Sequence, residues 1–189
     1  MEMIFANTRD QAFLAMVIQE ASKVAKQEDT YVGRTALQKV MYFLKALNVP
    51  INYRFDIYRY GPFCQEILDD VNILIVEAVI KDKSSSRRKY SNYAPDINTN
   101  ELITNFTDIE THRKKVKSIV NAFIPLKPKE LELLSTLDYL YRWFKASGAK
   151  MPFKEKVVDR FQELKPNKFG KRKIEKTYDL LVSVKLIEE

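Results

Sequence analysis

The sequence predicts a mainly α-helical protein with a small antiparallel sheet, on three observations. Apolar residues recur at helical spacing through most of the 189 residues. Over residues 51–59 this spacing gives way to alternation, as in a strand with one buried face. Two short runs flank a polar, basic stretch at residues 82–88 and predict a hairpin. A helix followed by a hairpin indicates a winged-helix-like N-terminal module, and the later helices indicate a helix-turn-helix-like C-terminal half.

Two helices are predicted before the extended run. The first covers residues 8–26, with Thr8 or Asn7 as its cap. Its apolar face comprises Phe13, Met16, Val17 and Val24. The second covers residues 34–47 and is expected to stop at Asn48-Val49-Pro50, because proline disfavours helix continuation. Its apolar face comprises Leu37, Val40, Met41, Leu44 and Leu47.

The extended run is expected to turn directly into a helix at Gly61-Pro62. Alternation places Tyr53, Phe55, Ile57 and Arg59 on one side of the strand and Arg54, Asp56 and Tyr58 on the other. Proline suits the first helical position because its φ is preset and it has no amide hydrogen to leave unpaired. Glycine before it can adopt the φ of a sharp turn. The helical stripe that follows comprises Phe63, Ile67, Val71, Leu74 and Ala78.

The predicted hairpin pairs residues 78–81 with residues 89–93. Residues 97–106 are polar and irregular in pattern, so a domain boundary is predicted there, between a module at residues 1–100 and a helical subdomain at residues 101–189. Four more helices are predicted, at residues 108–124, 129–146, 153–164 and 171–184. The last three, joined by short links, are the helix-turn-helix-like unit.

Composition indicates a globular, basic protein. Hydrophobic residues make up 46% of the chain, and 32 basic residues against 25 acidic ones give a net charge of +7. Such a charge attracts phosphate polymers at low salt. The single cysteine, Cys64, fits a reducing compartment and is interpreted as a small structural residue. With neither a signal peptide nor a spanning apolar segment, we expect a cytoplasmic location and no membrane partner.

Residues 33–74 resemble the SocA-like antitoxin (Panacea) domain and related YwgA-like uncharacterised bacterial proteins. The shared motifs are Leu37-Gln38-Lys39 with Tyr42, and an aromatic-rich strand that ends in Tyr60-Gly61-Pro62. The C-terminal half is less like that family. The resemblance implies a helical, winged-helix-like module that acts as an antitoxin or adaptor and holds another protein, such as a toxin. It carries over no catalytic residues.

The helix after Gly61-Pro62 has the wrong charge for a DNA-reading helix. A winged helix places this element in the major groove, where Arg, Lys, Asn or Gln reach base edges. Here no Lys or Arg occurs from Phe63 to Val79. Outside the apolar stripe lie Gln65, Glu66, Asp69, Asp70, Asn72 and Glu77. We therefore expect this face to be solvated surface or a docking surface for a basic partner.

Two basic clusters are candidate nucleic-acid contacts. At the hairpin tip the candidates are Lys83, Arg87, Arg88 and Lys89, close to Lys81. Around the start of the last helix they are Lys168, Lys171, Arg172 and Lys173, with Lys165 and Lys176 nearby. The alternative for both is ordinary solvated charge. A third cluster, Arg113, Lys114, Lys115 and Lys117, is typical of an amphipathic packing helix.

Tyrosines gather on the extended run and the hairpin. The candidate protein-partner surface comprises Tyr53, Tyr58, Tyr60, Tyr90 and Tyr93. Exposed tyrosines suit interfaces because a rigid ring contacts much surface at little entropic cost. The alternative is that these rings cover the hairpin's own core.

The sequence predicts neither an enzyme nor a metal or cofactor site. The one histidine, His112, has no cysteine or acid at metal-ligand spacing, and no phosphate-binding glycine loop or nucleophile motif occurs. Asp159, Glu163 and Lys165 follow a loosely nuclease-like order but fall on a predicted helix. The function predicted is a non-catalytic, antitoxin- or adaptor-like protein-binding module. The alternative is a tandem helix-turn-helix nucleic-acid-binding regulator.

Overall fold

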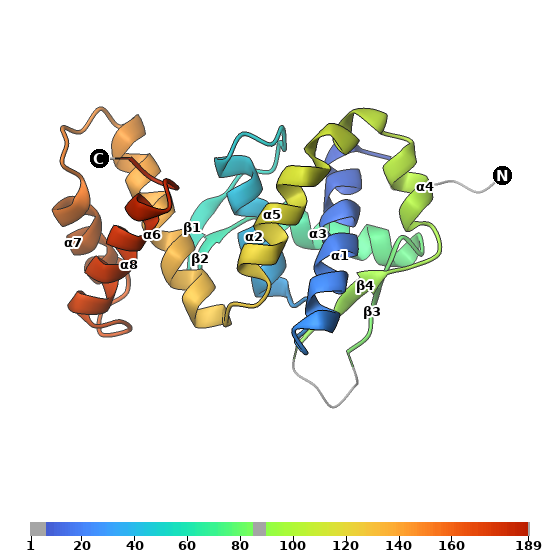
Figure 1. Ribbon diagram of the computed structural model, residues 1–189, viewed down its shortest axis with the longest axis horizontal. Coiled ribbons are helices and arrows are strands. Elements are labelled where there is room, and N and C mark those ends of the chain that lie inside the picture. The colour runs from blue at the N-terminus through green and yellow to red at the C-terminus, as the bar shows by residue number, and fades with distance from the viewer. Residues whose placement is uncertain (1–6, 85–89, 189) are drawn as a thin grey trace. The chain divides into compact units, whose positions relative to one another are not determined.

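The structure, a computed structural model, describes residues 7–84 and 90–188 (Figure 1). It is mainly helical with two small two-stranded antiparallel sheets, which confirms the predicted fold class. The chain forms two compact units. The first contains the described residues up to Asp56 together with Phe63–Pro128, and the second contains Ile57–Pro62 and the described residues from Lys129 onwards.

In the first unit, α1 (Arg9–Gln27) is the central helix, and most of its residues are buried. It contacts α2 (Arg34–Ala46) and α3 (Gln65–Val76) as well as the later helices of the unit. It begins with a capping box, in which the Thr8 hydroxyl accepts from the Gln11 amide at 3.2 Å and the Gln11 side chain accepts from the Thr8 amide at 3.1 Å. Of the two caps that the sequence allowed, Thr8 and Asn7, the helix uses Thr8.

The first unit continues past the boundary that we predicted near residue 100. Helix α4 (Thr99–Thr104), the 3₁₀ helix η1 (Thr107–His112) and α5 (Arg113–Phe123) all pack on α1, and α5 also contacts α2 (Figure 1). Phe123 of α5 stacks on Phe43 of α2 with ring centroids 4.3 Å apart. The apolar face of α5 thus completes the core that α1 and α2 leave open. Helix α4 itself was missed, because its residues are polar and show no clear period.

The second sheet pairs β3 (Ile80–Asp82) with β4 (Tyr93–Pro95), in the register Ile80 with Pro95 and Asp82 with Tyr93. The predicted hairpin pairing exists, but the returning strand lies later in the chain than residues 89–93. Asp82 explains the longer connection: its carboxylate accepts from the Asn92 amide at 2.8 Å and the Ser84 amide at 2.9 Å. Burial opposes ionisation of Asp82, but these hydrogen bonds outweigh it and lower the pKa of the carboxyl.

The prediction that Pro62 starts a helix is wrong. Pro62 lies inside β2 (Gly61–Phe63), which forms the first sheet with β1 (Asp56–Tyr58). Helix α3 begins only at Gln65, after Cys64 as its N-cap. Both strands of a two-stranded sheet are edge strands, where proline is tolerated. The predicted alternation is confirmed in part: Tyr53 is buried and Arg54, Asp56 and Tyr58 are exposed, whereas Phe55 and Ile57 are half-buried. Arg59, predicted on the buried side, is exposed, and the strand covers only Asp56–Tyr58 of the predicted run.

A buried side chain fixes the backbone between β2 and α3. The Gln38 amide nitrogen donates to the Cys64 carbonyl oxygen at 2.8 Å, and the Cys64 amide donates to the Gln38 side-chain oxygen at 3.0 Å. Both residues are buried. The glutamine of the Leu37-Gln38-Lys39 motif therefore pairs with both the carbonyl and the amide of the buried Cys64.

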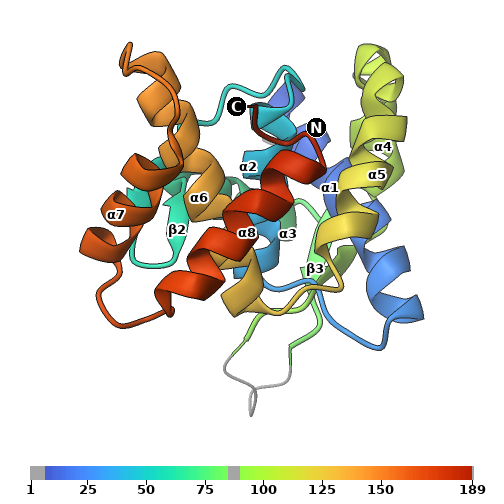
Figure 2. The same ribbon diagram turned by 60° about the vertical axis from the view of Figure 1, so that its left-hand side comes forward.

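The second unit is built on three helices, α6 (Pro128–Ala146), α7 (Lys154–Leu164) and α8 (Lys171–Ser183) (Figure 2). Their predicted positions are confirmed. The core that they share includes Leu137, Tyr141, Phe161, Ile174 and Tyr178. Phe153 joins this core just before α7, with its ring at right angles to that of Tyr141 and centroids 5.6 Å apart.

Gln38→Ala should lower the free energy of unfolding by about 2–4 kcal/mol, because it leaves two buried backbone groups of Cys64 unpaired. Urea unfolding followed by circular dichroism measures this loss. The matched control is Gln65→Ala, which removes an exposed glutamine whose side chain donates to Asp69 at 3.0 Å, and it should change stability by less than about 0.5 kcal/mol. Equal losses for the two variants would show that the Gln38 bonds contribute nothing specific.

Candidate functional site

The turn between β1 and β2 presents two tyrosines on a short, fixed loop. Tyr58 ends β1, Arg59 and Tyr60 form the turn, and Gly61 begins β2. The exposed fractions of Tyr58 and Tyr60 are 69% and 54%, among the largest for apolar side chains in the described residues. Alternation in the strand directs Tyr58 away from the buried side.

A buried lysine holds the backbone of this turn from beneath. The Lys165 ammonium donates to the carbonyl oxygens of Tyr58 at 3.3 Å and Arg59 at 2.5 Å, and to the Glu132 carboxylate at 2.9 Å. The Lys165 and Glu132 side chains are only 6% and 3% exposed. A buried ion pair is tolerated when hydrogen bonds also satisfy its remaining protons and lone pairs, and three acceptors around Lys165 meet that condition.

Gly61 allows the turn to lie directly against α6. Its φ is +88°, a conformation that side chains with a Cβ rarely adopt. A Cβ on Gly61 would lie 2.7 Å from the Thr136 hydroxyl and 3.1 Å from the Ser135 hydroxyl, both on α6. The glycine of the Tyr60-Gly61-Pro62 motif is therefore required twice, for backbone conformation and for close approach.

A cleft of about 880 Å³ opens beside the turn. It is lined by the turn residues and by the link between α7 and α8, comprising Ile57, Tyr58, Arg59, Tyr60, Leu164, Lys165, Pro166 and Lys168. The Lys168 ammonium lies 4.8 Å and the Arg59 guanidinium 5.7 Å from the centre of the Tyr60 ring, within cation–π range. The cleft is therefore bordered by two cations and an exposed aromatic ring.

The predicted basic cluster near α8 separates into two groups. Lys168 pairs with Glu132 at 2.7 Å and lines the cleft. Lys171, Arg172 and Lys173 are exposed in the first turn of α8, with Asp159 3.8 Å from the Lys171 ammonium. Asp159, Glu163 and Lys165 do not converge, since Glu163 pairs with Arg160 and Lys165 with Glu132.

Two of the five predicted surface tyrosines are buried, which corrects the predicted partner surface. Tyr53 packs inward because it lies on the buried side of the extended run, and its hydroxyl donates to Asp70 at 2.5 Å. Tyr93 is buried in β4, and its hydroxyl accepts from Arg34 at 3.3 Å. Tyr90 is exposed and stacks on Tyr31, with centroids 5.4 Å apart. The cleft brings together only Tyr58 and Tyr60 of the five.

Two residues of the predicted hairpin-tip cluster lie among the described residues. Lys83 is exposed, and Lys81 pairs with Asp96 at 2.8 Å. Arg87, Arg88 and Lys89 lie outside the described residues. On α3, Asp69 is exposed and Asp70 turns inward to Tyr53, as their adjacent positions predict. Within the described ranges, no group of acids, cysteines and histidine has a metal-binding arrangement.

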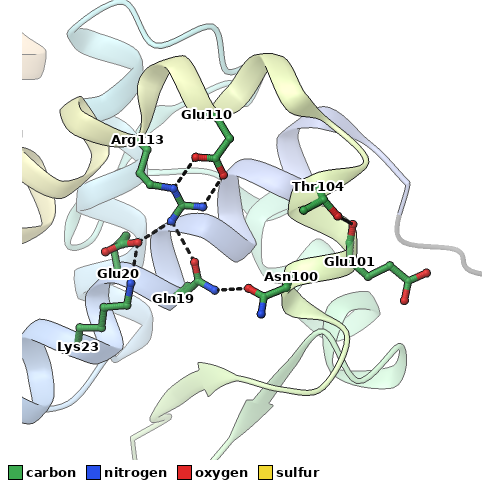
Figure 3. Close-up of polar contacts among 8 residues, drawn as sticks. All are labelled: Gln19, Glu20, Lys23, Asn100, Glu101, Thr104, Glu110 and Arg113. Atoms are coloured by element: carbon green, nitrogen blue, oxygen red, sulfur yellow. Dashed lines mark hydrogen bonds and ion pairs between the residues drawn. The ribbon is translucent and has the colours of Figure 1, made fainter.

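Of the third basic cluster, Arg113 joins helices of the first unit, whereas Lys114, Lys115 and Lys117 are exposed (Figure 3). Arg113 makes a two-point contact with Glu110, at 2.7 and 2.6 Å, and donates to Glu20 at 2.6 Å and Gln19 at 3.0 Å. Burial opposes ionisation of Glu20, but hydrogen bonds from Lys23 and Arg113 outweigh it and lower its pKa. This network joins α5 to α1, in agreement with the predicted packing role.

Glu132 is the site residue that the sequence analysis missed. It lies 33 positions before Lys165 and inside an otherwise apolar part of α6, between Leu131 and Leu133. A carboxylate at a position that helical spacing assigns to the core is the signal that could have identified it, because a buried charge requires a partner.

Comparison with known proteins finds a similarity to a bacterial protein. No family model matches the chain. The chain is 23% identical to the uncharacterised protein YwgA of Bacillus subtilis (strain 168) over 118 residues, which cover 62% of this chain and 70% of YwgA. This supports the YwgA-like part of the resemblance, and the likeness to SocA-like antitoxins stays a prediction. Across residues 7–84 and 90–188, none of the helices has the length and apolar character to cross a bilayer.

Gly61→Ala should lower the free energy of unfolding by about 2–4 kcal/mol, through an unfavourable φ and a clash with α6. The matched control is Gly148→Ala. Gly148 also has a positive φ, +74°, but nothing lies within 4 Å of an added Cβ, so only the conformational cost of about 1 kcal/mol applies. Urea unfolding of both variants measures the difference, and equal losses would exclude a role for close approach.

Stability should fall at alkaline pH, in part through Tyr53. Burial, and then the hydrogen bond to Asp70, raise the pKa of the Tyr53 hydroxyl far above its ordinary 10.0, and burial raises that of the Cys64 thiol above 9.0. Both groups stay protonated when folded, so the unfolded state alone loses protons as pH rises through those ordinary values. Tyr53→Phe should flatten the decline in unfolding free energy by up to about 1.4 kcal/mol per pH unit.

Urea unfolding at increasing pH measures this slope, and the exposed Tyr90 supplies the control variant Tyr90→Phe. An alkaline slope for Tyr53→Phe identical to that of the unmodified chain would contradict the assignment.

Proposed function

We propose that this protein is a non-catalytic protein-binding module, antitoxin- or adaptor-like, whose binding element is the turn at residues 58–60. The observation that carries the proposal is the contrast within that turn. Its backbone is held by the buried Lys165 and Glu132, whereas the rings of Tyr58 and Tyr60 are mostly exposed. A fixed backbone lowers the entropic cost of binding, and tyrosine is among the residues that contribute most to interfaces.

The position of the two motifs supports this proposal. Gln38, from the first motif, fixes the backbone at Cys64, and Tyr60-Gly61-Pro62 forms the turn and the start of β2. Both motifs thus act on the chain between residues 58 and 64. The family whose pattern they resemble uses its module to hold another protein, and the similarity to YwgA is compatible with that use.

A nucleic-acid-binding regulator is the second candidate, favoured by one feature. Lys171, Arg172 and Lys173 are exposed at the start of α8, the last helix of a three-helix unit. In a helix-turn-helix the first turn of the second helix approaches the bases. Three adjacent cations there would neutralise phosphates and produce a salt-dependent affinity.

A photo-crosslinking amino acid placed at Tyr58, in cells of the native host, should yield a discrete adduct with one protein, because this side chain is the most exposed ring of the turn. The matched control is the same amino acid at Trp143, an aromatic position of the same unit that is 52% exposed but lies on α6. Gel electrophoresis and mass spectrometry identify the adduct. With the identified partner, Tyr58→Ala should weaken binding by about 2 kcal/mol while circular dichroism stays unchanged.

Nuclease-sensitive adducts at both positions, together with duplex binding whose salt dependence decreases in Lys171→Ala/Arg172→Ala, would contradict the proposal and favour the second candidate. Equal protein adducts at Tyr58 and Trp143 would show that the turn has no special role.

A further inference from the structure

The cleft beside the turn has a one-sided charge. Its lining includes Arg59, Lys165 and Lys168, and no acid occurs among the described residues that line it. Glu132 is the carboxylate that Lys165 and Lys168 share from beneath. Three cations and one carboxylate leave a net charge of +2 at this place.

Only part of that positive charge is available to a partner. Lys165 is buried, and its three N–H groups are matched by three acceptors, the carbonyl oxygens of Tyr58 and Arg59 and the Glu132 carboxylate. Lys168 is 30% exposed, and its ammonium donates to Glu132 at 2.7 Å. The exposed Arg59 guanidinium contacts the Tyr60 ring. The cleft therefore offers two accessible cations around one exposed aromatic ring.

We infer that this cleft binds a short acidic segment of the partner protein, with side-chain carboxylates on Arg59 and Lys168 and the intervening chain against Tyr60. The inference rests on the proposed function and names the chemistry of the partner. Hydrogen bonds between such cations and a carboxylate are charge-assisted and about twice as strong as neutral ones. The ring supplies contact area between them.

The number of cations favours an acidic peptide over a nucleic acid at this site. A single strand of nucleic acid needs a groove of positive charge that follows several phosphates, with a series of rings for successive bases. The described lining offers two accessible cations and two tyrosines beside a short turn. Two cations beside a tyrosine ring can bind two carboxylates of an extended peptide segment.

The test measures binding of a labelled short peptide of alternating glutamate and serine to the full chain by fluorescence anisotropy at low salt. The same peptide with glutamine in place of glutamate tests the need for charge, and a short oligothymidylate tests the nucleic-acid alternative. We expect the acidic peptide to bind, the glutamine peptide to bind at least about tenfold more weakly, and amide shifts in NMR spectra to centre on Tyr60 and Lys168.

Arg59→Glu should weaken binding of the acidic peptide by about tenfold. Lys114→Glu is the matched control, because it makes the same change of charge at an exposed position in the first turn of α5, and it should leave the affinity within about twofold. Lys168→Gln removes the second cation while Glu132 keeps its ion pair with Lys165, and should also weaken binding.

Two results would overturn the inference and leave the proposed function in place: equal binding of the glutamine and glutamate peptides, or absence of acidic-peptide binding while the Tyr58 crosslink still yields a protein partner. Oligothymidylate binding that shifts Tyr60 and Lys168, without peptide binding and without a protein adduct, would overturn both.

Discussion

The arrangement of the second unit depends on a lysine and a glutamate that are both buried. Lys165 and Glu132 are taken out of water, at a cost of several kcal/mol for each ion, and this cost is offset only where every donor and acceptor finds a partner. Two of the acceptors around Lys165 are backbone carbonyls of the turn. The turn therefore cannot move without leaving an ammonium unsatisfied, and its geometry is tied to the packing of α6 and the link before α8.

This constraint explains how so small an element keeps one backbone conformation. A two-residue turn in a two-stranded sheet has little stability by itself. Here a buried charge network fixes its backbone, and Gly61 brings it against the hydroxyls of α6. The side chains that point outward, Tyr58 and Tyr60, are thus presented in one arrangement, and Arg59 and Lys168 surround one of them with positive charge.

In the first unit, too, buried polar groups are paired with specific partners, and there the pairs join helices. Arg113, Glu110 and Glu20 form a partly buried network that joins α5 to α1 (Figure 3). Gln38 satisfies the backbone of Cys64 in the same way, with an amide in place of charges. In each case a polar group inside the unit is matched by a specific partner far along the chain, so these contacts select one packing of the helices.

The sequence by itself determined the helices and the inward side of the extended run, because both are visible in the local spacing of apolar residues. Periodicity located α1, α2, α6, α7 and α8, and alternation distinguished the buried Tyr53 from the exposed Arg54 and Tyr58. The cap was narrowed to Thr8 or Asn7, and the structure shows Thr8 paired with Gln11 three residues later.

Only the tertiary structure decided where Pro62 lies and which charges meet. Proline suits both a first helical position and an edge strand. Pro62 lies in β2 because the positive φ of Gly61 turns the chain back and because Gln38 hydrogen-bonds Cys64 just before the helix begins. Glu132 and Lys165 are 33 residues apart, so no local pattern pairs them. The two side chains are buried because α6 packs against the α7–α8 link, and their burial fixes the backbone of the turn. The spacing of apolar residues alone does not specify that packing.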